Sequence, residues 1–331
     1  MKRFTTKIRS IICCLALLLP AAVIAQGKPL KVLNTSYPLG GSTSYFWVAY
    51  RSGSFEKHGL KLNPVYIRGS VTSLQALLAR ELSIQMEAAA AGVRAWARGA
   101  KEVTLIGAVG NRLDYLLVTL PSIKKPEELK GKRIGVSQIG ASSDFIARYA
   151  VRQLGLNPEK DVTILGAGGM GQRWAALTGG HIEATVVQPP YTLMARKGGY
   201  PVLIDLSKQD FQYATSAVMT TRSFIRSDND TVMNFMRGLA DGMDFYRAEA
   251  NKEKVIQYLG EYYRSNSREE LEETRRAYSQ LTPGLPIISA KSVENVIAND
   301  KDIASMGLNP AAMLDLSFLE RLQEERKVKS K

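Results

Sequence analysis

The strongest constraint on the fold is a cycle of strand, small-residue turn and helix that repeats between residues 129 and 190. The first two apolar strands break into turns rich in glycine, alanine and serine, and the third ends at Gln188-Pro189-Pro190. The two helices end at glycine, a common left-handed residue after a helix C-terminus. Strands that alternate with helices in this way predict a parallel sheet with crossover connections. The predicted strands end at Ser137 or span 162–165 and 182–187, and the predicted helices span 145–154 and 172–178.

The N-terminal part of the chain follows the same plan, so we expect an α/β protein with two similar halves. Strands at 30–33, 60–67 and 83–86 alternate with helices at 45–57 and 71–80. Strands at 103–109 and 115–120 would carry the chain out of the first half, and a strand at 211–220 would carry it back. From residue 230 the sequence is helical. Two such halves facing each other would form a cleft lined by glycine- and serine-rich turns from both sides.

The turns after the strands are the candidate binding elements, because ligands of open parallel sheets lie beyond the carboxyl ends of the strands. Small residues let a ligand approach the backbone, and the first free N–H groups of a helix favour an anion. The turn Gly140-Ala141-Ser142-Ser143 has this form. Two interpretations stay open, because Ser142 or Ser143 could also simply cap its own helix. Glu87, at the end of a strand, could recognise a cationic group or cap the next helix.

Residues 1–25 have the pattern of a secretion signal, with an apolar run at 11–19 and small or modest residues before a cleavage site after Ala25. Both cysteines, Cys13 and Cys14, fall inside this leader. The exported chain is therefore expected to have no disulfide, thiolate nucleophile or cysteine metal site. Ile12 before Cys13 and the continuing apolar run argue against a lipoprotein. We expect a periplasmic protein.

Charge and histidine content exclude further classes. The 44 basic residues include Lys2, Arg3, Lys7 and Arg9 of the leader, which leaves 40 against 31 acidic residues. The basic residues are scattered among acids without interleaved aromatics, so no nucleic-acid partner is expected, and a mild preference for anionic ligands remains. The two histidines, His58 and His181, lie beside glycines without matching carboxylates, and no metal site is expected.

Several segments of the chain resemble the nitrate, sulfonate and taurine group of ABC-transporter substrate-binding proteins. This group shares its fold with a family of pyrimidine-precursor synthases. The segments that carry the resemblance are 55–60, 129–136, 145–150, 154–162 and 189–190, and together they extend over essentially all of the exported chain. One segment departs from the family pattern. Arg80-Glu81-Leu82-Ser83 stands where the family usually has Gly-Glu, then Ile or Val, then Asp.

The resemblance implies the two-lobed periplasmic binding protein fold of type II, with a ligand cleft between the lobes. Lobe one would comprise residues 28–115 plus 216–331, and lobe two residues 116–215. By this analogy the ligand faces residues from both lobes and from the predicted hinge. They are Ser36, Tyr37, Gly41, Ser42, Gly69, Ser70, Glu87, Ala88, Arg112, Ser137, Ala141, Ser142, Ser143, Gly168, Gly169 and Gln188. Arg112 could pair with an acidic ligand or with Asp114.

The implied function is capture of a small molecule and its delivery to an ABC permease by a monomer without cofactor. Serine-lined helix N-termini favour an oxyanion, such as a sulfonate or carboxylate. A pyrimidine-like heterocycle is the other ligand class considered. Tyr37, Tyr45 and Trp47 would allow an aromatic body. A nucleotide-binding enzyme is the first rival, because 166–171 matches the dinucleotide fingerprint, but Gln188 stands where that fingerprint needs an acid. The second rival is a pyrimidine-precursor synthase; that family carries a cysteine-rich motif, which the exported chain lacks. No catalytic residue is therefore assigned.

Overall fold

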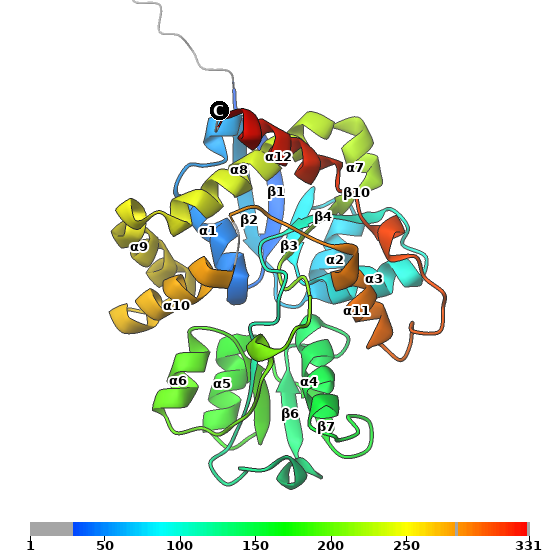
Figure 1. Ribbon diagram of the computed structural model, residues 1–331, viewed down its shortest axis with the longest axis vertical. Coiled ribbons are helices and arrows are strands. Elements are labelled where there is room, and N and C mark those ends of the chain that lie inside the picture. Colours follow the sequence, from blue (N-terminus) through cyan, green and yellow to red (C-terminus); the bar gives the residue numbers. More distant parts are fainter. Residues whose placement is uncertain (1–28, 282–283, 330–331) are drawn as a thin grey trace, which may run out of the picture.

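The protein consists of two lobes, one above the other in Figure 1, each built around a five-stranded sheet. The structure is a computed structural model that describes residues 29–281 and 284–329. The predicted signal peptide, including Cys13 and Cys14, lies outside the described residues. In the part of the chain that is described, no helix is both long and apolar enough to cross a membrane.

The first sheet has the strand order β2-β1-β3-β10-β4. β1 pairs in parallel with β2 and β3, whereas β10 lies antiparallel between β3 and β4. β3, β4 and β10 are buried along their whole length, which explains their nearly continuous runs of uncharged residues. The strands are β1 Lys31–Tyr37, β2 Leu60–Tyr66, β3 Ile84–Glu87, β4 Val103–Ala108 and β10 Ala217–Thr221.

The second sheet repeats this plan with the order β7-β6-β8-β5-β9. β6 is parallel to β7 and β8, and β5 lies antiparallel between β8 and β9. The strands are β5 Leu116–Thr119, β6 Arg133–Val136, β7 Thr163–Gly166, β8 Ala184–Val187 and β9 Val202–Asp205. All five lie between residues 116 and 215, and we propose to keep these as the limits of the second lobe. β9 was not predicted, because its four residues show too little of a strand pattern.

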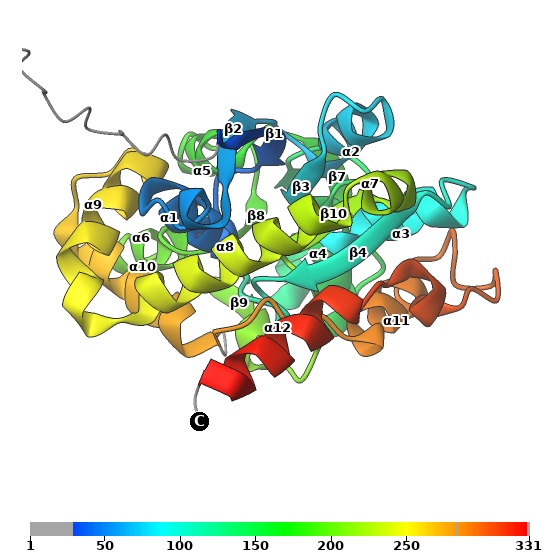
Figure 2. The same ribbon diagram turned by 90° about the horizontal axis from the view of Figure 1, so that it is seen from above.

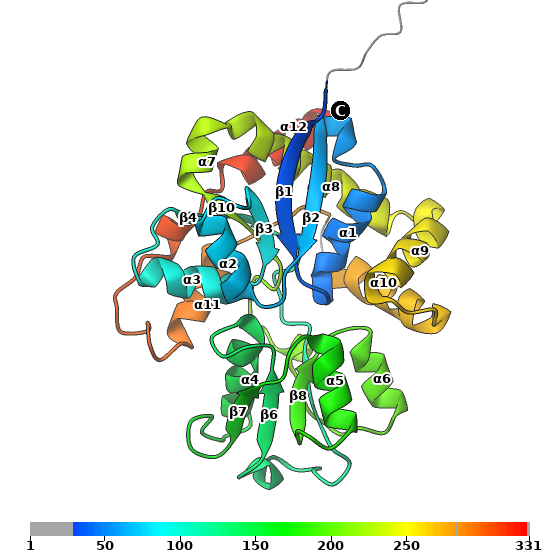
Figure 3. The same ribbon diagram turned by 180° about the vertical axis from the view of Figure 1, so that it is seen from behind.

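Helices cover both faces of each sheet (Figures 1 and 3). On the first sheet, α1 and α8 cover one face, and α2, α3 and α11 cover the other. On the second sheet, α4 packs on one face and α5 with α6 on the other. The helices are α1 Ser44–Arg51, α2 Ser70–Leu78, α3 Ala89–Ala97, α4 Ser142–Gln153, α5 Met170–Thr178, α6 Tyr191–Lys197, α7 Arg222–Ser227, α8 Asn229–Arg247, α9 Lys252–Tyr263, α10 Arg268–Leu281, α11 Ala290–Ala298 and α12 Ser317–Lys329.

α8 is the longest of these helices and crosses the first lobe between α1 and α12 (Figure 2). Its apolar stripe, which includes Phe235, Leu239 and Met243, is fully buried against α1 and the first sheet. The stripe predicted from the sequence is therefore a packing face, and its methionines fill the core.

The chain crosses between the lobes twice, and the two crossing segments run side by side. Thr215 N donates to Gly110 O at 3.0 Å, and Val109 N donates to Ser216 O at 3.0 Å. The predicted strand at 211–220 is wrong in its first half, because residues 211–216 form the returning crossing segment and β10 begins only at Ala217. The few hydrogen bonds between the two crossing segments give partners to some of their backbone N–H and C=O groups, although the segment 211–216 belongs to neither sheet.

Candidate ligand-binding site

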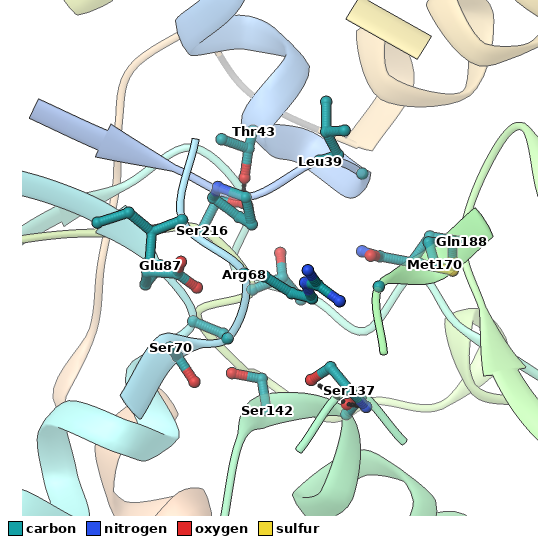
Figure 4. Close-up of a pocket in the computed structure, with 18 of the residues that line it drawn as sticks. Leu39, Thr43, Arg68, Ser70, Glu87, Ser137, Ser142, Met170, Gln188 and Ser216 are labelled. Carbon is teal, nitrogen blue, oxygen red and sulfur yellow. Dashed lines mark hydrogen bonds between the residues drawn. The ribbon is translucent and has the colours of Figure 1, made fainter. Parts of the chain in front are cut away.

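The carboxyl ends of strands from both sheets point toward a cavity between the lobes with a volume of about 80 Å³. Ile67–Ser70 follows β2, Glu87 ends β3, Ser137 follows β6 and Gln188 follows β8, and all of them line it. This is the position that the topology of an open parallel sheet gives to a ligand. Figure 4 shows side chains from these turns, among them Arg68, Glu87 and Ser142, converging on one space.

Four helices begin at the cavity wall, which gives the site a positive electrostatic character. The lining includes Gly69 before α2, Ala88 before α3, Ser142 in α4 and Gly169 before α5. None of the N-cap residues of these helices accepts a capping hydrogen bond with its side chain. The first N–H groups of several helices therefore face a space in which a ligand could accept from them.

Ser142 and Ser143 are the first residues of α4 and do not cap it, so the capping alternative is wrong. Ala141 is the N-cap, and it has no polar side chain. Ser143 Oγ accepts from Ser137 N at 2.7 Å and joins Ser137 Oγ at 2.8 Å, which ties the end of β6 to the start of α4. Ser142 Oγ lies near the hydroxyl of Tyr213 and lines the cavity.

Arg173 places a buried positive charge in the cavity wall. Its side chain is only 3% exposed, and Nη1 donates to Val186 O at 2.7 Å and to Thr185 Oγ1 at 3.2 Å. Among the described residues no carboxylate pairs with it, and Nε has no hydrogen-bond partner. Burial lowers the pKa of Arg173 to about 10, so the guanidinium stays charged at neutral pH. Arg68 lines the same cavity and donates to Gln172 Oε1 of the other lobe at 2.9 Å.

Glu87 faces the cavity as a buried carboxyl group, and it is not the partly exposed cap that the sequence left as one possibility. Its side chain is 4% exposed, and Oε1 forms no hydrogen bond. Burial raises the pKa of Glu87 to about 8, which keeps the group mostly protonated at pH 7. At neutral pH the charges in the cavity wall are therefore those of Arg68 and Arg173.

Gln188 joins the second lobe to the crossing segment and to the first lobe. Its Nε2 donates to Asp114 Oδ1 at 2.7 Å, and burial raises the pKa of Asp114 to about 6 against the lowering effect of this hydrogen bond. Gly41 approaches Gln188 so closely that a Cβ there would lie 2.9 Å from Gln188 Cδ, and its φ of 61° also favours glycine. The turn after β1 can therefore reach the second lobe only with glycine at this position.

The structure brings nine of the predicted site residues together around the cavity. They come from both lobes and are Gly69, Ser70, Glu87, Ala88, Ser137, Ser142, Ser143, Gly169 and Gln188. All of them follow the carboxyl end of a strand or begin a helix, as the sequence pattern indicated.

The other predicted site residues lie behind the cavity wall or outside it. Ser36 and Ser42 are buried and bond to Ser73 and to the 215–216 segment, Ala141 is buried, and Gly41 contacts Gln188. Gly168, with a φ of 83°, shapes the turn before α5. Tyr37 lines a neighbouring groove.

Arg112 does not line the cavity but a separate hollow at the crossing segments. Its side chain is 53% exposed and pairs with Asp210 at 3.7 Å. It does not pair with Asp114, whose Oδ1 accepts from Gln188 instead. A position at the hinge in sequence therefore did not place this arginine in the cleft.

Sequence reasoning missed several residues of the cavity wall, above all Arg68, Arg173, Thr43 and Ser216. A signal for Arg173 exists, because it lies on the buried face of α5 with Met170 and Leu177, where a charged residue needs an explanation. Thr43 and Ser216 share a hydrogen bond of 2.7 Å across the crossing point, which no local pattern reveals. Within the described residues, no cluster of three or more histidine, cysteine or acidic side chains could hold a metal ion.

Solved structures with this architecture include binding proteins and one enzyme. The alkanesulfonate-binding protein SsuA from Xanthomonas axonopodis pv. citri, bound to MOPS, is 16% identical, with 88% of this chain and 100% of that chain covered and a TM-score of 0.71. The periplasmic aliphatic sulphonate binding protein SsuA from Escherichia coli is 19% identical, with 86% and 91% covered and a TM-score of 0.63. The desulfurization enzyme DSZB is 13% identical, with 89% and 99% covered and a TM-score of 0.65.

At these identities the similarity establishes the two-lobed periplasmic binding protein fold, and it leaves the choice of ligand to the site. No curated protein matches the chain at a significant level. A family model described as "NMT1/THI5 like" matches residues 42–252, which is more than half of the chain. The protein therefore belongs to the NMT1/THI5-like family.

Proposed function

We propose that this protein is the extracytoplasmic solute-binding component of an ABC importer. In this role a periplasmic monomer captures a small organic anion or an anionic heterocycle between its lobes and delivers it to a membrane permease. Sulfonates, carboxylates and pyrimidine-like heterocycles are the ligand classes we consider. Ligand binding would shift the population toward the closed arrangement of the lobes, which the permease recognises.

The unpaired guanidinium of Arg173 is the observation that carries this proposal. A buried charge without a counter-ion is costly, and a partner that brings the opposite charge relieves that cost. Four helix N-termini lie at the cavity wall, so an anion is the group that would best complete it. The volume of about 80 Å³ suits a compact head group such as a sulfonate or carboxylate.

The fold is also compatible with an enzyme, because the desulfurization enzyme DSZB shares this architecture. The residues that line the cavity include neither histidine nor cysteine among those described, and Ser137 bonds to Ser143, not to a base. A nucleophile needs an activating base within hydrogen-bond reach. The geometry therefore favours binding over covalent catalysis.

A thermal-shift panel tests the proposal directly. Purified protein would be screened against alkanesulfonates, nitrate, aromatic carboxylates and pyrimidines, with NAD and pyridoxal phosphate as probes for the enzyme alternatives. A ligand at about 100 times its Kd stabilises the folded state by about 2.7 kcal/mol. We expect hits among the small anions. Hits confined to NAD or pyridoxal phosphate would contradict the proposal.

The variant Arg173→Met then tests the role of the guanidinium on the best anionic hit. Losing a buried charged partner costs about 2–5 kcal/mol, so calorimetry should show an affinity at least about 30-fold lower. Arg173→Lys keeps the charge and should lie in between. Arg196→Met is the matched control, because Arg196 belongs to the same lobe but its side chain is 57% exposed and pairs with Asp205. Equal affinities in all four proteins would remove Arg173 from the site.

A further inference from the structure

We propose that the ligand has a planar aromatic or heteroaromatic body, which lies in a second, aromatic part of the site while its anionic group occupies the inner cavity. This second part, the aromatic groove, has a volume of about 470 Å³ and lies beside the inner cavity. The inference rests on the proposed function, because it extends the same ligand beyond the cavity in which its anionic group is held.

The inner cavity and the aromatic groove are neighbours that share part of their walls. Arg68, Tyr66, Leu39 and Met170 line both, together with the backbone of Gly40 and Gly169. The inner cavity alone holds only a compact head group, at about 80 Å³ against about 470 Å³ for the groove. A ligand with its head in the cavity therefore extends into the groove if it is larger than that head.

Six of the fifteen residues that line the groove are aromatic. Tyr37, Trp47 and Tyr66 come from β1, α1 and β2, Tyr262 and Tyr263 from the end of α9, and Tyr191 from the start of α6. Tyr37 is the centre of this group, because its ring lies 5.5 Å from Trp47 and 6.2 Å from both Tyr66 and Tyr262. Tilted and offset contacts at these distances are the arrangement that aromatic rings favour, and a planar ligand can join them.

The groove is held in shape by hydrogen bonds to the turn that lines the inner cavity. The hydroxyl of Tyr262 donates to Pro38 O at 2.7 Å and accepts from Gly40 N at 3.0 Å, and the hydroxyl of Tyr263 donates to Gly41 O at 3.3 Å. Fixed rings lose little conformational freedom when a ligand binds. The groove is therefore organised before the ligand arrives.

Arg68 lines both parts, and its guanidinium bonds to Gln172 Oε1 of the other lobe. Figure 4 shows the Arg68 side chain among the residues of the inner cavity. Its charge can pair with the anionic group from the groove side while the helix N-termini face that group from within. Tyr66 is 44% exposed at the mouth of the groove, a large aromatic surface that the protein itself leaves uncovered. A stacked ring would cover this surface.

Matched ligand pairs test the inference by calorimetry. Ethanesulfonate is compared with 2-phenylethanesulfonate, and acetate with phenylacetate, so that each pair shares an anionic head and differs in the ring. We expect the aryl member of a pair to bind about tenfold or more tightly. Tyr66→Ala should remove most of the difference in affinity between the two members of each pair. Val65→Ala is the control, because Val65 precedes Tyr66 in the edge strand β2 and is 42% exposed.

Each result decides between the two proposals. Equal binding within both pairs, or exclusion of the aryl members, would overturn the aromatic groove and leave the anion site standing. Failure of both members of both pairs to bind would overturn the proposed ligand class and the groove with it. Trp47 gives an independent readout. In the double variant Trp96→Phe with Trp174→Phe, Trp47 is the tryptophan that remains, and an aryl ligand in the groove should change its fluorescence emission. An unchanged emission at saturation would also overturn the groove.

Discussion

Two buried ionisable side chains, Glu87 and Arg173, face the same cavity from opposite lobes without forming an ion pair with each other. The guanidinium of Arg173 remains charged, whereas burial keeps Glu87 mostly protonated at pH 7. A protonated carboxyl can donate a hydrogen bond, and it adds no negative charge that would repel an anion. The protonation of Glu87 therefore maintains the positive character of the site.

Replacing Glu87 by glutamine should stabilise the protein in a way that depends on pH. The folded-state pKa of Glu87 is about 8 against its usual value of 4.5, so the folded protein binds an additional proton between these values. Its stability relative to Glu87→Gln must then fall as pH rises from about 4.5 and level off above about 8. Urea unfolding should show near-equal stability at pH 4 and a gain of a few kcal/mol for the variant at pH 9.

Glu81→Gln serves as the control for this comparison, because Glu81 is an exposed glutamate on the turn before β3. Its effect on stability should be small, because the side chain is exposed. A stability gain of Glu87→Gln that stayed constant from pH 4 to pH 9 would show that the carboxyl does not titrate in this range.

Small turn residues were predictable at the scale of single residues, and isolated charges were not. Ser142 and Ser143 were found because they stand between a strand and a helix, a position that sequence spacing identifies. Arg173 was missed because its importance comes from its burial without an ion-pair partner among the described residues, which only the folded structure shows. Arg112 was expected in the cleft for its place in the sequence, but its side chain points to Asp210.

At the scale of elements, two glycines of α8 allow α1 and its following turn to pack closely. A Cβ at Gly242 would lie 2.5 Å from Ala49 Cα in α1, and a Cβ at Gly238 would lie 3.0 Å from Phe55 Cα. Both neighbours are backbone atoms, which cannot move aside as a flexible side chain can. These glycines are therefore required for the contact between α8 and α1, despite their poor helix propensity.

Gly242→Ala should destabilise the protein by about 2–3 kcal/mol, because overpacking at this backbone contact exceeds the gain in helix propensity. Gly260→Ala in α9 is the matched control, since the nearest atom to its Cβ is Ser265 O at 3.1 Å. For that variant we expect a change within about 1 kcal/mol. Urea unfolding of both variants would measure the difference, and equal stability would show that α1 and α8 separate easily.

Most of the central strands and helices could be predicted, because each apolar run ends at a glycine, serine or proline. The segment 211–216 could not, since its hydrophobic residues pack at the crossing between lobes. Tyr213, for example, stacks on Phe145 of α4 with ring centroids 5.2 Å apart. Such a contact produces the residue types of a strand without a strand's hydrogen bonds. Tyr45 was a similar case, because it was considered for the ligand but is fully buried against Tyr246.

At the scale of the whole molecule, contacts on both sides of the cleft hold the lobes together. On one side Arg94 of α3 donates to Gly140 O at 2.7 Å, and Arg152 of α4 donates to Asn299 O at 2.7 Å. On the other side Lys197 of α6 pairs with Glu269 of α10. These contacts join the lobes on both sides of the cleft, and their free energy adds to whatever a ligand contributes to holding the lobes together.

The Lys197–Glu269 pair allows the contribution of closure to ligand affinity to be measured without touching the cavity. Lys197→Glu would oppose two carboxylates across the cleft, and we expect the affinity for the best anionic ligand to fall about two- to fivefold and the radius of gyration without ligand to rise. The swapped pair, Lys197→Glu with Glu269→Lys, should restore both values, whereas Lys208→Glu controls for net charge at an exposed lysine of the same lobe. The loss should shrink at high salt, because the pair is exposed to solvent. If the swapped pair binds no better than the single variant, this contact does not help to close the lobes, and the contacts of Arg94 and Arg152 must hold them together.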